Sequence, residues 1–235
     1  MRTWALSAGL SIAVVGCAVP IDPYEVPLDE FSEKQRALVE PILTDVAAKV
    51  ELESNDVRSR AEIYDFLLSE MPFTGGVVRE LGRGKWEIFR DPKDPEPDVF
   101  FVLDKAGMRL RFELVRKEPT RRFYVSTGSF DMGILPRLEG RTIVVMRAVP
   151  VGEVVRTDAV VYVKVDTPFY ATLAKGVRSV VENVVREKSG YFIRAARWVA
   201  EEAASRPDWL YMQVRESKEV DQAVLEDFRK RFLLR

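Results

Sequence analysis

The fold is decided by residues 141–187, RTIVVMRAVPVGEVVRTDAVVYVKVDTPFYATLAKGVRSVVENVVRE. Two apolar runs rich in β-branched residues, at 141–148 and 159–165, flank a turn at Gly152. The connection between them is too short for a parallel crossover, so the runs predict antiparallel strands. Thr167-Pro168 then supplies a typical helix N-cap and a proline at the first helical position. The stretch therefore predicts a strand pair followed by a long helix.

Upstream of this stretch, apolar residues recur at every second position, as in strands. The clearest case is 108–115, where apolar residues alternate with charged ones and predict a half-buried strand. Asp104-Lys105-Ala106-Gly107, just before it, is typical of a hairpin turn. Further strands are predicted at 85–90, 98–103 and 121–126. Together the runs predict an antiparallel sheet of about five to seven strands.

N-terminal to the strands the period is helical. The S-x-x-Q pattern at 32–35 resembles a capping box and predicts a helix over 33–50, whose apolar residues recur at three- and four-residue steps. A second helix is predicted after 55–56. Pro72 and the glycine pair at 75–76 are expected to end it.

At the C-terminal end the long helix is expected to break or bend at Ser189-Gly190. A second helical stretch is predicted at 191–204, and an amphipathic helix at 219–233. The pattern at 208–214 predicts no particular element.

The N-terminus has the pattern of a secretory signal peptide. Arg2 gives a short positive region, and 4–15 is an uncharged, mainly apolar run that is shorter than a usual membrane span. The run ends in Val14-Val15-Gly16-Cys17, which contains the single cysteine of the chain. This segment resembles the lipobox of bacterial lipoproteins.

That resemblance implies cleavage after residue 16, lipidation of Cys17 and anchoring of the protein in the cell envelope through its acyl chains. Ala18 stands where an aspartate would resemble an inner-membrane retention signal. In a Gram-negative host the resemblance thus implies the outer membrane, facing the periplasm. The alternative is an uncleaved hydrophobic anchor with an incidental cysteine.

Composition excludes several kinds of chemistry. The chain has 235 residues and no histidine, which rules out Ser-His-Asp and Cys-His catalysis and His-ligated metals. A single cysteine rules out an intrachain disulfide. With 36 basic and 37 acidic residues, the net charge of -1 gives no bulk attraction for nucleic acid. We therefore expect no catalytic residue, no metal, no cofactor and no nucleic-acid partner.

Helices, then antiparallel strands, then a long C-terminal helix resembles the helix-grip order of START-like domains, the SRPBCC superfamily of hydrophobic-ligand binders. The likeness is best from Gly128 to Glu187 and extends over about 33–205. It implies an α+β fold in which a curved antiparallel sheet grips the C-terminal helix, with further helices at both ends. It also implies a cavity between sheet and helix that an apolar ligand fills.

The residues expected to face that cavity are apolar residues of the strands and of the long helix. They are Leu110, Phe112, Phe123, Val125, Ile143, Val145, Val161, Val163, Phe169, Leu173 and Val177. For any one of them the alternative is plain core packing, which is the usual role of an apolar residue on an inward sheet face.

The predicted organisation is a signal peptide at 1–16, a lipidated cysteine with a proline-rich tether at 17–31, and one α+β domain at 32–235. The part of that domain at 206–235 is a helical extension beyond the helix-grip core. The leading hypothesis is a membrane-anchored lipoprotein that binds or carries a lipid or other hydrophobic small molecule. Two alternatives stay open: a structural lipoprotein that binds another envelope protein, and a cyclase-like enzyme.

Overall fold

The computed structural model describes residues 24–91, 93, 96–131, 137–168 and 174–234. Seven strands form one antiparallel sheet in the order β1-β7-β6-β5-β4-β3-β2. The strands are β1 Ala48–Val57, β2 Trp86–Phe89, β3 Val99–Asp104, β4 Arg109–Lys117, β5 Arg121–Phe130, β6 Leu138–Val151 and β7 Val154–Val165. This confirms the predicted antiparallel sheet at the upper end of its expected size.

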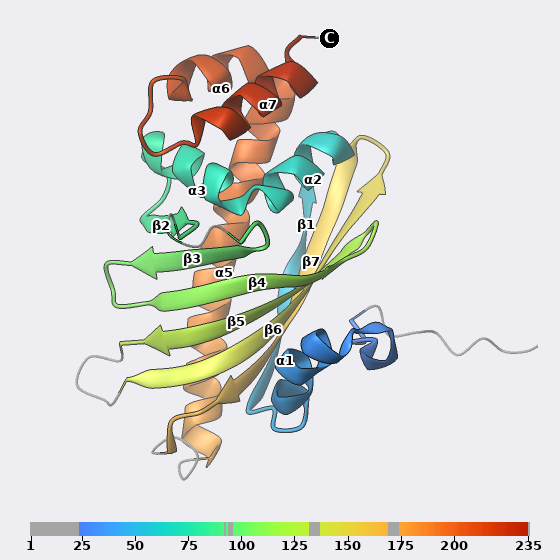
Figure 1. The fold of residues 1–235 in the computed structure, drawn as a ribbon, viewed down its shortest axis with the longest axis vertical. Coiled ribbons are helices and arrows are strands. Elements are labelled where there is room, and N and C mark those ends of the chain that lie inside the picture. Colours follow the sequence, from blue (N-terminus) through green and yellow to red (C-terminus); the bar gives the residue numbers. More distant parts are fainter. Residues whose placement is uncertain (1–23, 92, 94–95, 132–136, 169–173, 235) are drawn as a thin grey trace, which may run out of the picture.

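Helices cover both faces and one end of the sheet (Figure 1). They are η1 Leu28–Glu30, α1 Glu33–Leu43, α2 Ala61–Ser69, α3 Met71–Glu80, α5 Ala174–Ser205, α6 Pro207–Val214 and α7 Gln222–Phe232. The long α5 crosses one face of the sheet and α1 lies on the other, while α2, α3, α6 and α7 gather at one end. The predicted class, an α+β fold with an antiparallel sheet against a long C-terminal helix, is confirmed.

Two apolar clusters follow from this layering. The larger lies on the α5 face and continues into the end formed by α2, α3, α6 and α7. The smaller lies between the sheet and α1, and it includes Phe31, Phe123 and Ile143. The central strands are therefore buried on both faces, which removes the simple alternation of apolar and polar residues from them.

The predicted helix over 33–50 is wrong in its second half. Its start is confirmed, because Ser32 caps α1 with the expected capping box. However, α1 ends at Leu43, and β1 begins at Ala48 and pairs with β7. Val46 and Val50 continue the four-residue spacing of the apolar residues in α1. This spacing hides the alternating burial of β1, so the sequence pattern predicts a helix there.

The second predicted helix is α2, which ends at Ser69, just before Pro72 as expected. The prediction missed α3, which starts at Met71 with Pro72 in its first turn, where the missing N–H is harmless. Two other predicted breaks are wrong. Gly75 and Gly76 are buried inside α3, which packs closely against β2 and the segment before α7. Ser189-Gly190 interrupts nothing, because α5 is continuous over both residues.

The residues that would test Thr167 as an N-cap lie outside the described part of the chain, but its side chain has a further contact. Its hydroxyl accepts the backbone N–H of Glu139 at 2.8 Å, which ties the end of β7 to the start of β6. At the C-terminal end, residues 208–214 form part of α6, and the predicted last helix is confirmed as α7 with Asp221 as its N-cap.

The described part of the predicted tether, residues 24–31, packs against the sheet. Tyr24, Val26 and Leu28 contact the smaller cluster, and Phe31 is buried with its ring edge against Phe123 at 5.7 Å between centroids. The apolar residues on both sides of Pro27 therefore cover the α1 face of the sheet.

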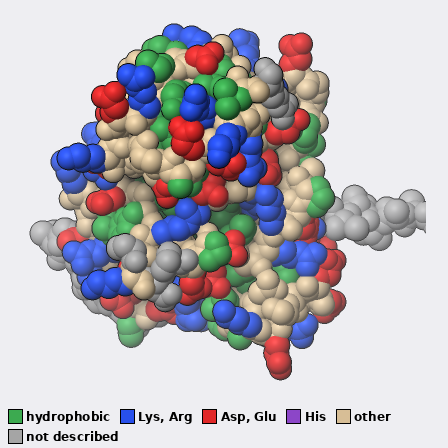
Figure 2. Space-filling view, turned by 45° about the horizontal axis from the view of Figure 1, so that its top comes forward, with side chains coloured by type: hydrophobic (Ala, Val, Ile, Leu, Met, Phe, Trp, Pro, Cys, Tyr) green, Lys and Arg blue, Asp and Glu red, His purple; other side chains and the backbone are tan. Residues whose placement is uncertain are grey.

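Charges of both signs are mixed over the surface seen in Figure 2, with no large region of one sign. This agrees with the near-zero net charge of the sequence. Among the described residues, no helix combines the length and apolarity needed to span a bilayer.

Candidate functional site

A cavity of about 170 Å³ lies between the sheet and α5. Its sheet wall comes from every strand, mostly from β3 to β7, and its roof comes from α5 through Val181, Val184, Val185, Phe192 and Ile193. The roof residues recur at three- and four-residue steps, so they share one face of the helix. The lining is overwhelmingly apolar, as binding of an uncharged hydrophobic group requires.

The structure places four of the predicted residues in this lining: Leu110 and Phe112 from β4, and Val161 and Val163 from β7. Phe112 stacks on Phe100 of β3 with ring centroids 5.2 Å apart. These two rings form one aromatic stack of the sheet wall.

Four other predicted residues, Phe123, Val125, Ile143 and Val145, belong to the opposite face. All four are buried in the smaller cluster under α1. Both faces of β5 and β6 are apolar, so hydrophobicity alone did not show which set points toward α5. The prediction that they face the long helix is therefore corrected.

The remaining predictions are not placed against the cavity. Phe169 and Leu173 lie outside the described residues, as do the signal peptide and Cys17. Val177 belongs to α5, but its side chain also falls outside the description.

Sequence reasoning missed the residues of β5 and β6 that do face the cavity. They are the neighbours, one position along, of the residues that were predicted: Tyr124, Ser126, Thr142, Val144 and Met146. The strand register carries the signal that was needed. Phe112 is opposite Ser126, and residues directly opposite each other in an antiparallel pair share a face.

A pair of glycines helps to leave this space open. Gly128 of β5 and Gly140 of β6 lie opposite each other in the sheet, and both line the cavity. A Cβ on Gly128 would lie 2.0 Å from the carbonyl oxygen of Arg109, so a side chain there is incompatible with the observed strand spacing. The sheet wall thus has no side chains at this pair.

Three polar groups of the lining already have partners. The hydroxyls of Ser126 and Thr142 lie 2.7 Å apart and share a hydrogen bond. The hydroxyl of Tyr124 donates to the backbone oxygen of Leu68 at 3.2 Å, and burial raises the pKa of this phenol above its ordinary value. These groups are therefore neutral and internally bonded at pH 7.

One ion pair fixes the roof to the sheet. Lys188 of α5 lines the cavity, and its Nζ lies 2.7 Å from Oδ2 of Asp104 at the end of β3. Burial would raise the pKa of Asp104, but the hydrogen bonds from Lys188 and the backbone of Met108 outweigh it, and the pKa is lowered. The carboxylate therefore stays ionised and holds α5 over the cavity.

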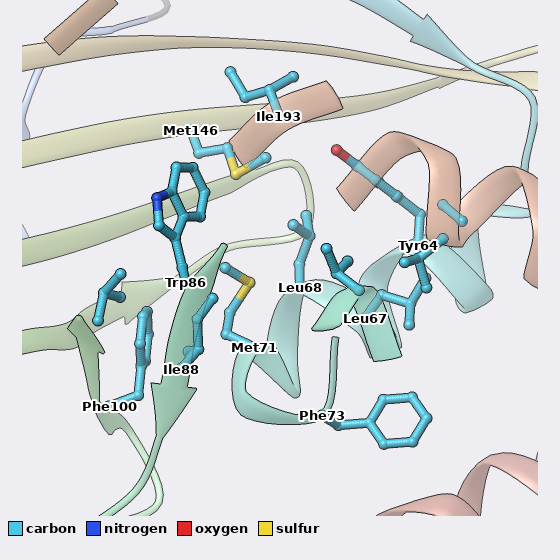
Figure 3. Packing of buried hydrophobic residues seen from close by; sticks show 14 of the residues in the cluster. Tyr64, Leu67, Leu68, Met71, Phe73, Trp86, Ile88, Phe100, Met146 and Ile193 are labelled. Carbon is cyan, nitrogen blue, oxygen red and sulfur yellow. The ribbon is translucent and has the colours of Figure 1, made fainter. Parts of the chain in front are cut away.

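Aromatic and sulfur side chains close the end of the cavity nearest α2 and α3. Trp86 stacks on Phe192 at 5.5 Å between centroids and meets Tyr191 edge-on at 4.9 Å. Figure 3 shows Met71 and Met146 beside Trp86 in this region. Methionine has a flexible side chain that fills irregular spaces, so the side chains at this end can adjust to the shape of a bound molecule.

No group of three or more acidic or cysteine side chains within the described ranges is placed to hold a metal ion. The acidic residue in the cavity lining is Glu139, at the start of β6. The lining of the cavity is thus mainly apolar, and its charged residues are Glu139, Lys164 and Lys188.

No protein-family model matches the chain, and no curated protein matches it either. Similar solved structures include TTHA0849 from Thermus thermophilus, at 16% identity, covering 67% of this chain and 99% of the other, with a TM-score of 0.44. Ara h 8.0201 is 13% identical over 65% of this chain and 96% of its own, again at a TM-score of 0.44.

A third similar structure is the di-domain ARO/CYC protein BexL from the BE-7585A biosynthetic pathway. It is 15% identical over 71% of this chain, with a TM-score of 0.44, and this chain spans 53% of its length. At these identities the comparisons concern the fold alone. The fold of this chain is an open seven-stranded antiparallel sheet packed against a long C-terminal helix.

Proposed function

We propose that this protein binds or carries a small hydrophobic molecule in the cavity between the sheet and α5. The observation that carries the proposal is the apolar cavity itself, because a purely structural domain would fill this space with side chains. The hydroxyls in its lining are bonded to one another or to the backbone, so they do not demand a polar ligand.

The size of the cavity limits the ligand. Its volume of about 170 Å³ is close to that of a ~150 Å³ engineered cavity that stays dry and binds benzene. One ring system or a short alkyl segment therefore fits the cavity as it stands. A longer lipid-like ligand would place only part of its length between the sheet and α5.

Adjacent valines of β6 provide the test, because Val144 lines the cavity and Val145 is fully buried in the other cluster. Val144→Phe should fill the cavity, weaken binding of indole by at least about tenfold and change the free energy of unfolding by less than ~1 kcal/mol. Val145→Phe should overpack a dense core, cost ~1–3 kcal/mol and leave indole affinity unchanged in the folded fraction.

Titration calorimetry with indole and urea denaturation measure these two effects, and native mass spectrometry reports any co-purifying apolar ligand. The alternative of a structural lipoprotein is favoured if the wild type binds neither indole nor a cellular lipid and both valine variants are destabilised alike.

The proposal also places the protein on the cell envelope through Cys17. It is supported by the lipobox-like Val14-Val15-Gly16-Cys17 after an apolar run, and by the positive charge of Arg2 before it. In a Gram-negative host we propose the outer membrane, facing the periplasm. Lipidation would keep the cavity close to a membrane that holds apolar molecules.

Replacing Cys17 with Ser removes the thiol that lipidation needs. We expect the variant to accumulate as an uncleaved precursor, whereas mass spectrometry of the wild type should find an acylated N-terminus at residue 17. Wild-type protein that keeps Met1 and a free thiol would contradict the anchoring proposal and leave the cavity proposal unaffected.

A further inference from the structure

A second, polar cleft of about 760 Å³ shares no lining residue with the apolar cavity. It is bounded by α2, α7, the turn that joins β4 to β5, and the adjoining ends of β6 and β7. Four basic side chains line it, Lys117, Arg122, Lys230 and Arg231. The proposed binding of an apolar molecule makes no use of this cleft.

Arg122 is unusual within it. Its side chain is 2% exposed, and its Nη2 donates to Oδ1 of Asp65 on α2. Its Nε is buried and has no hydrogen-bond partner among the described residues. An unused N–H on a buried guanidinium is costly, so it marks a position that an acceptor oxygen would fill.

Other Arg–Asp pairs of this sheet show what is missing. Arg147 bonds Asp158 through Nε at 3.0 Å and Nη2 at 2.6 Å, and Arg141 bonds Asp166 through the same two atoms at 2.9 and 2.6 Å. Both pairs are bidentate, as planar guanidinium and carboxylate groups prefer. Arg122 is more buried than either of these arginines. It nevertheless makes only the bond through Nη2 and lacks the one through Nε.

The reason is that Asp65 serves two cations. Its Oδ2 accepts Lys117 Nζ at 2.9 Å, and this leaves only Oδ1 for Arg122. The two oxygens of Asp65 thus point to different cations, and neither of them reaches Nε of Arg122. A phosphate monoester has three terminal oxygens in a tetrahedral arrangement, so one oxygen can face each of the donors Nε, Nη2 and Nζ.

The charge balance points the same way. Glu70 is neutralised by Arg90 at 3.1 Å, and Asp227 by Arg231 at 2.8 Å. The two other charges in the lining, Glu62 and Lys230, offset each other. Asp65 then faces both Arg122 and Lys117, which leaves one positive charge in excess at the base of the cleft.

We propose that Arg122 and Lys117 form a binding site for a phosphate-type oxyanion, which exchanges with the carboxylate of Asp65. Asp65 is 45% exposed, so it is free to turn toward solvent when the anion enters. The source of the phosphate is either a soluble phosphate ester or a lipid headgroup.

Isothermal titration of the purified protein with inorganic phosphate, against chloride at equal ionic strength, tests the site. The wild type should bind weakly, because Asp65 competes. Asp65→Asn removes the competing charge and should tighten phosphate binding by at least about tenfold. A purely structural ion pair predicts the opposite, a less stable protein that gains no affinity for phosphate.

Arg122→Gln should abolish phosphate binding, and Lys117→Gln should weaken it by about tenfold. Arg147→Gln is the matched control, because it removes a paired arginine from the same sheet and should leave phosphate binding unchanged. Lys117 is 43% exposed, so Lys117→Gln is expected to fold. It therefore tests the site even if Arg122→Gln fails to fold.

Flotation with phosphatidylcholine vesicles, with and without phosphatidic acid, separates the two sources. Binding that requires both phosphatidic acid and Arg122 identifies a lipid headgroup, and binding of inorganic phosphate alone identifies a soluble ester. The proposal is overturned if Asp65→Asn binds phosphate no more tightly than the wild type, or if Arg122→Gln binds it equally well.

Discussion

Among single residues, the most informative charge beside the cavity is Asp104. Its side chain is only 5% exposed, yet both carboxylate oxygens are satisfied. Oδ1 accepts the backbone N–H of Met108 at 2.8 Å, which closes the β3–β4 turn, and Oδ2 accepts Lys188 of α5. One residue therefore fixes a hairpin and anchors the helix that roofs the cavity.

Asp104→Asn should lower the free energy of unfolding at pH 7 by about 1–3 kcal/mol, because it removes a charge-assisted pair from a mostly buried position. The effect should depend on pH in a definite direction. The pKa of Asp104 is lowered by folding, so the unfolded chain takes up the proton first. The stabilisation is thus complete above the ordinary carboxyl pKa of 3.8 and disappears as pH falls through the lower folded-state value.

Urea denaturation of both proteins from about pH 7 down to about pH 3 measures this difference. Asp45→Asn is the control, because Asp45 also pairs with a lysine, Lys164, but is 72% exposed. It should change stability by less than ~1 kcal/mol. A difference between wild type and Asp104→Asn that grows toward acid pH would contradict the assigned role.

Among the helices, two glycines show how position decides what a glycine does. Gly76 lies inside α3, where a Cβ would come within 2.2 Å of the backbone oxygen of Glu219. Gly190 lies inside α5, where a Cβ would meet only Nη1 of Arg194, the end of a flexible side chain, at 3.3 Å. Gly76 is therefore required for the close packing of α3. Gly190 lowers the helix propensity of α5 without being required by any contact.

Opposite effects are therefore expected from the same substitution. Gly76→Ala should cost at least ~1–3 kcal/mol, because the segment before α7 must move away from α3. Gly190→Ala should stabilise by about 0.5–1 kcal/mol, the usual gain of alanine over glycine inside a helix. Thermal and urea unfolding of the two variants measure both values, and equal effects of one sign would show that α3 is not held by this contact.

The same elements show how far the sequence predicts the fold. Strands β2 and β4 follow from their period of two, the other strands from β3 to β7 follow from apolar runs of strand length, and the short connections correctly predict antiparallel pairing. The pattern failed where packing outweighs local signals. Val50 fits a helical spacing by coincidence, and Gly75 and Gly190 look like breaks although tertiary contacts or helix continuity accommodate them.

The candidate site was harder to predict than the fold. Leu110 and Phe112 alternate with charged residues, so their face was readable from the sequence. In β5 and β6 both faces are buried, one by α5 and the other by α1, and only the strand register distinguishes Val144 from Val145. The cavity itself depends on how side chains meet, which no pattern in the sequence records.

In the molecule as a whole, the C-terminal extension is part of the main core. Phe228 and Phe232 of α7 lie within 6.0 Å, between ring centroids, of Phe66 in α2, and Phe228 lies equally near Phe73 in α3. All four rings belong to the cluster that continues between the sheet and α5. The last helix thus braces α2 and α3, the helices between which Met71 reaches the cavity.

Phe228→Ala should therefore destabilise the entire domain and not only α7. Phe228 is fully buried among the aromatic rings, and the loss of such a side chain typically costs ~3–5 kcal/mol. Leu234→Ala is the control, because Leu234 is 63% exposed and its removal should change stability by less than ~0.5 kcal/mol. If Phe228→Ala melts α7 alone, hydrogen exchange will find faster exchange confined to 206–235, and the extension is then an appendage. If the domain unfolds as one unit, exchange rates will rise in α2, α3 and β2 as well, and indole affinity will fall with them.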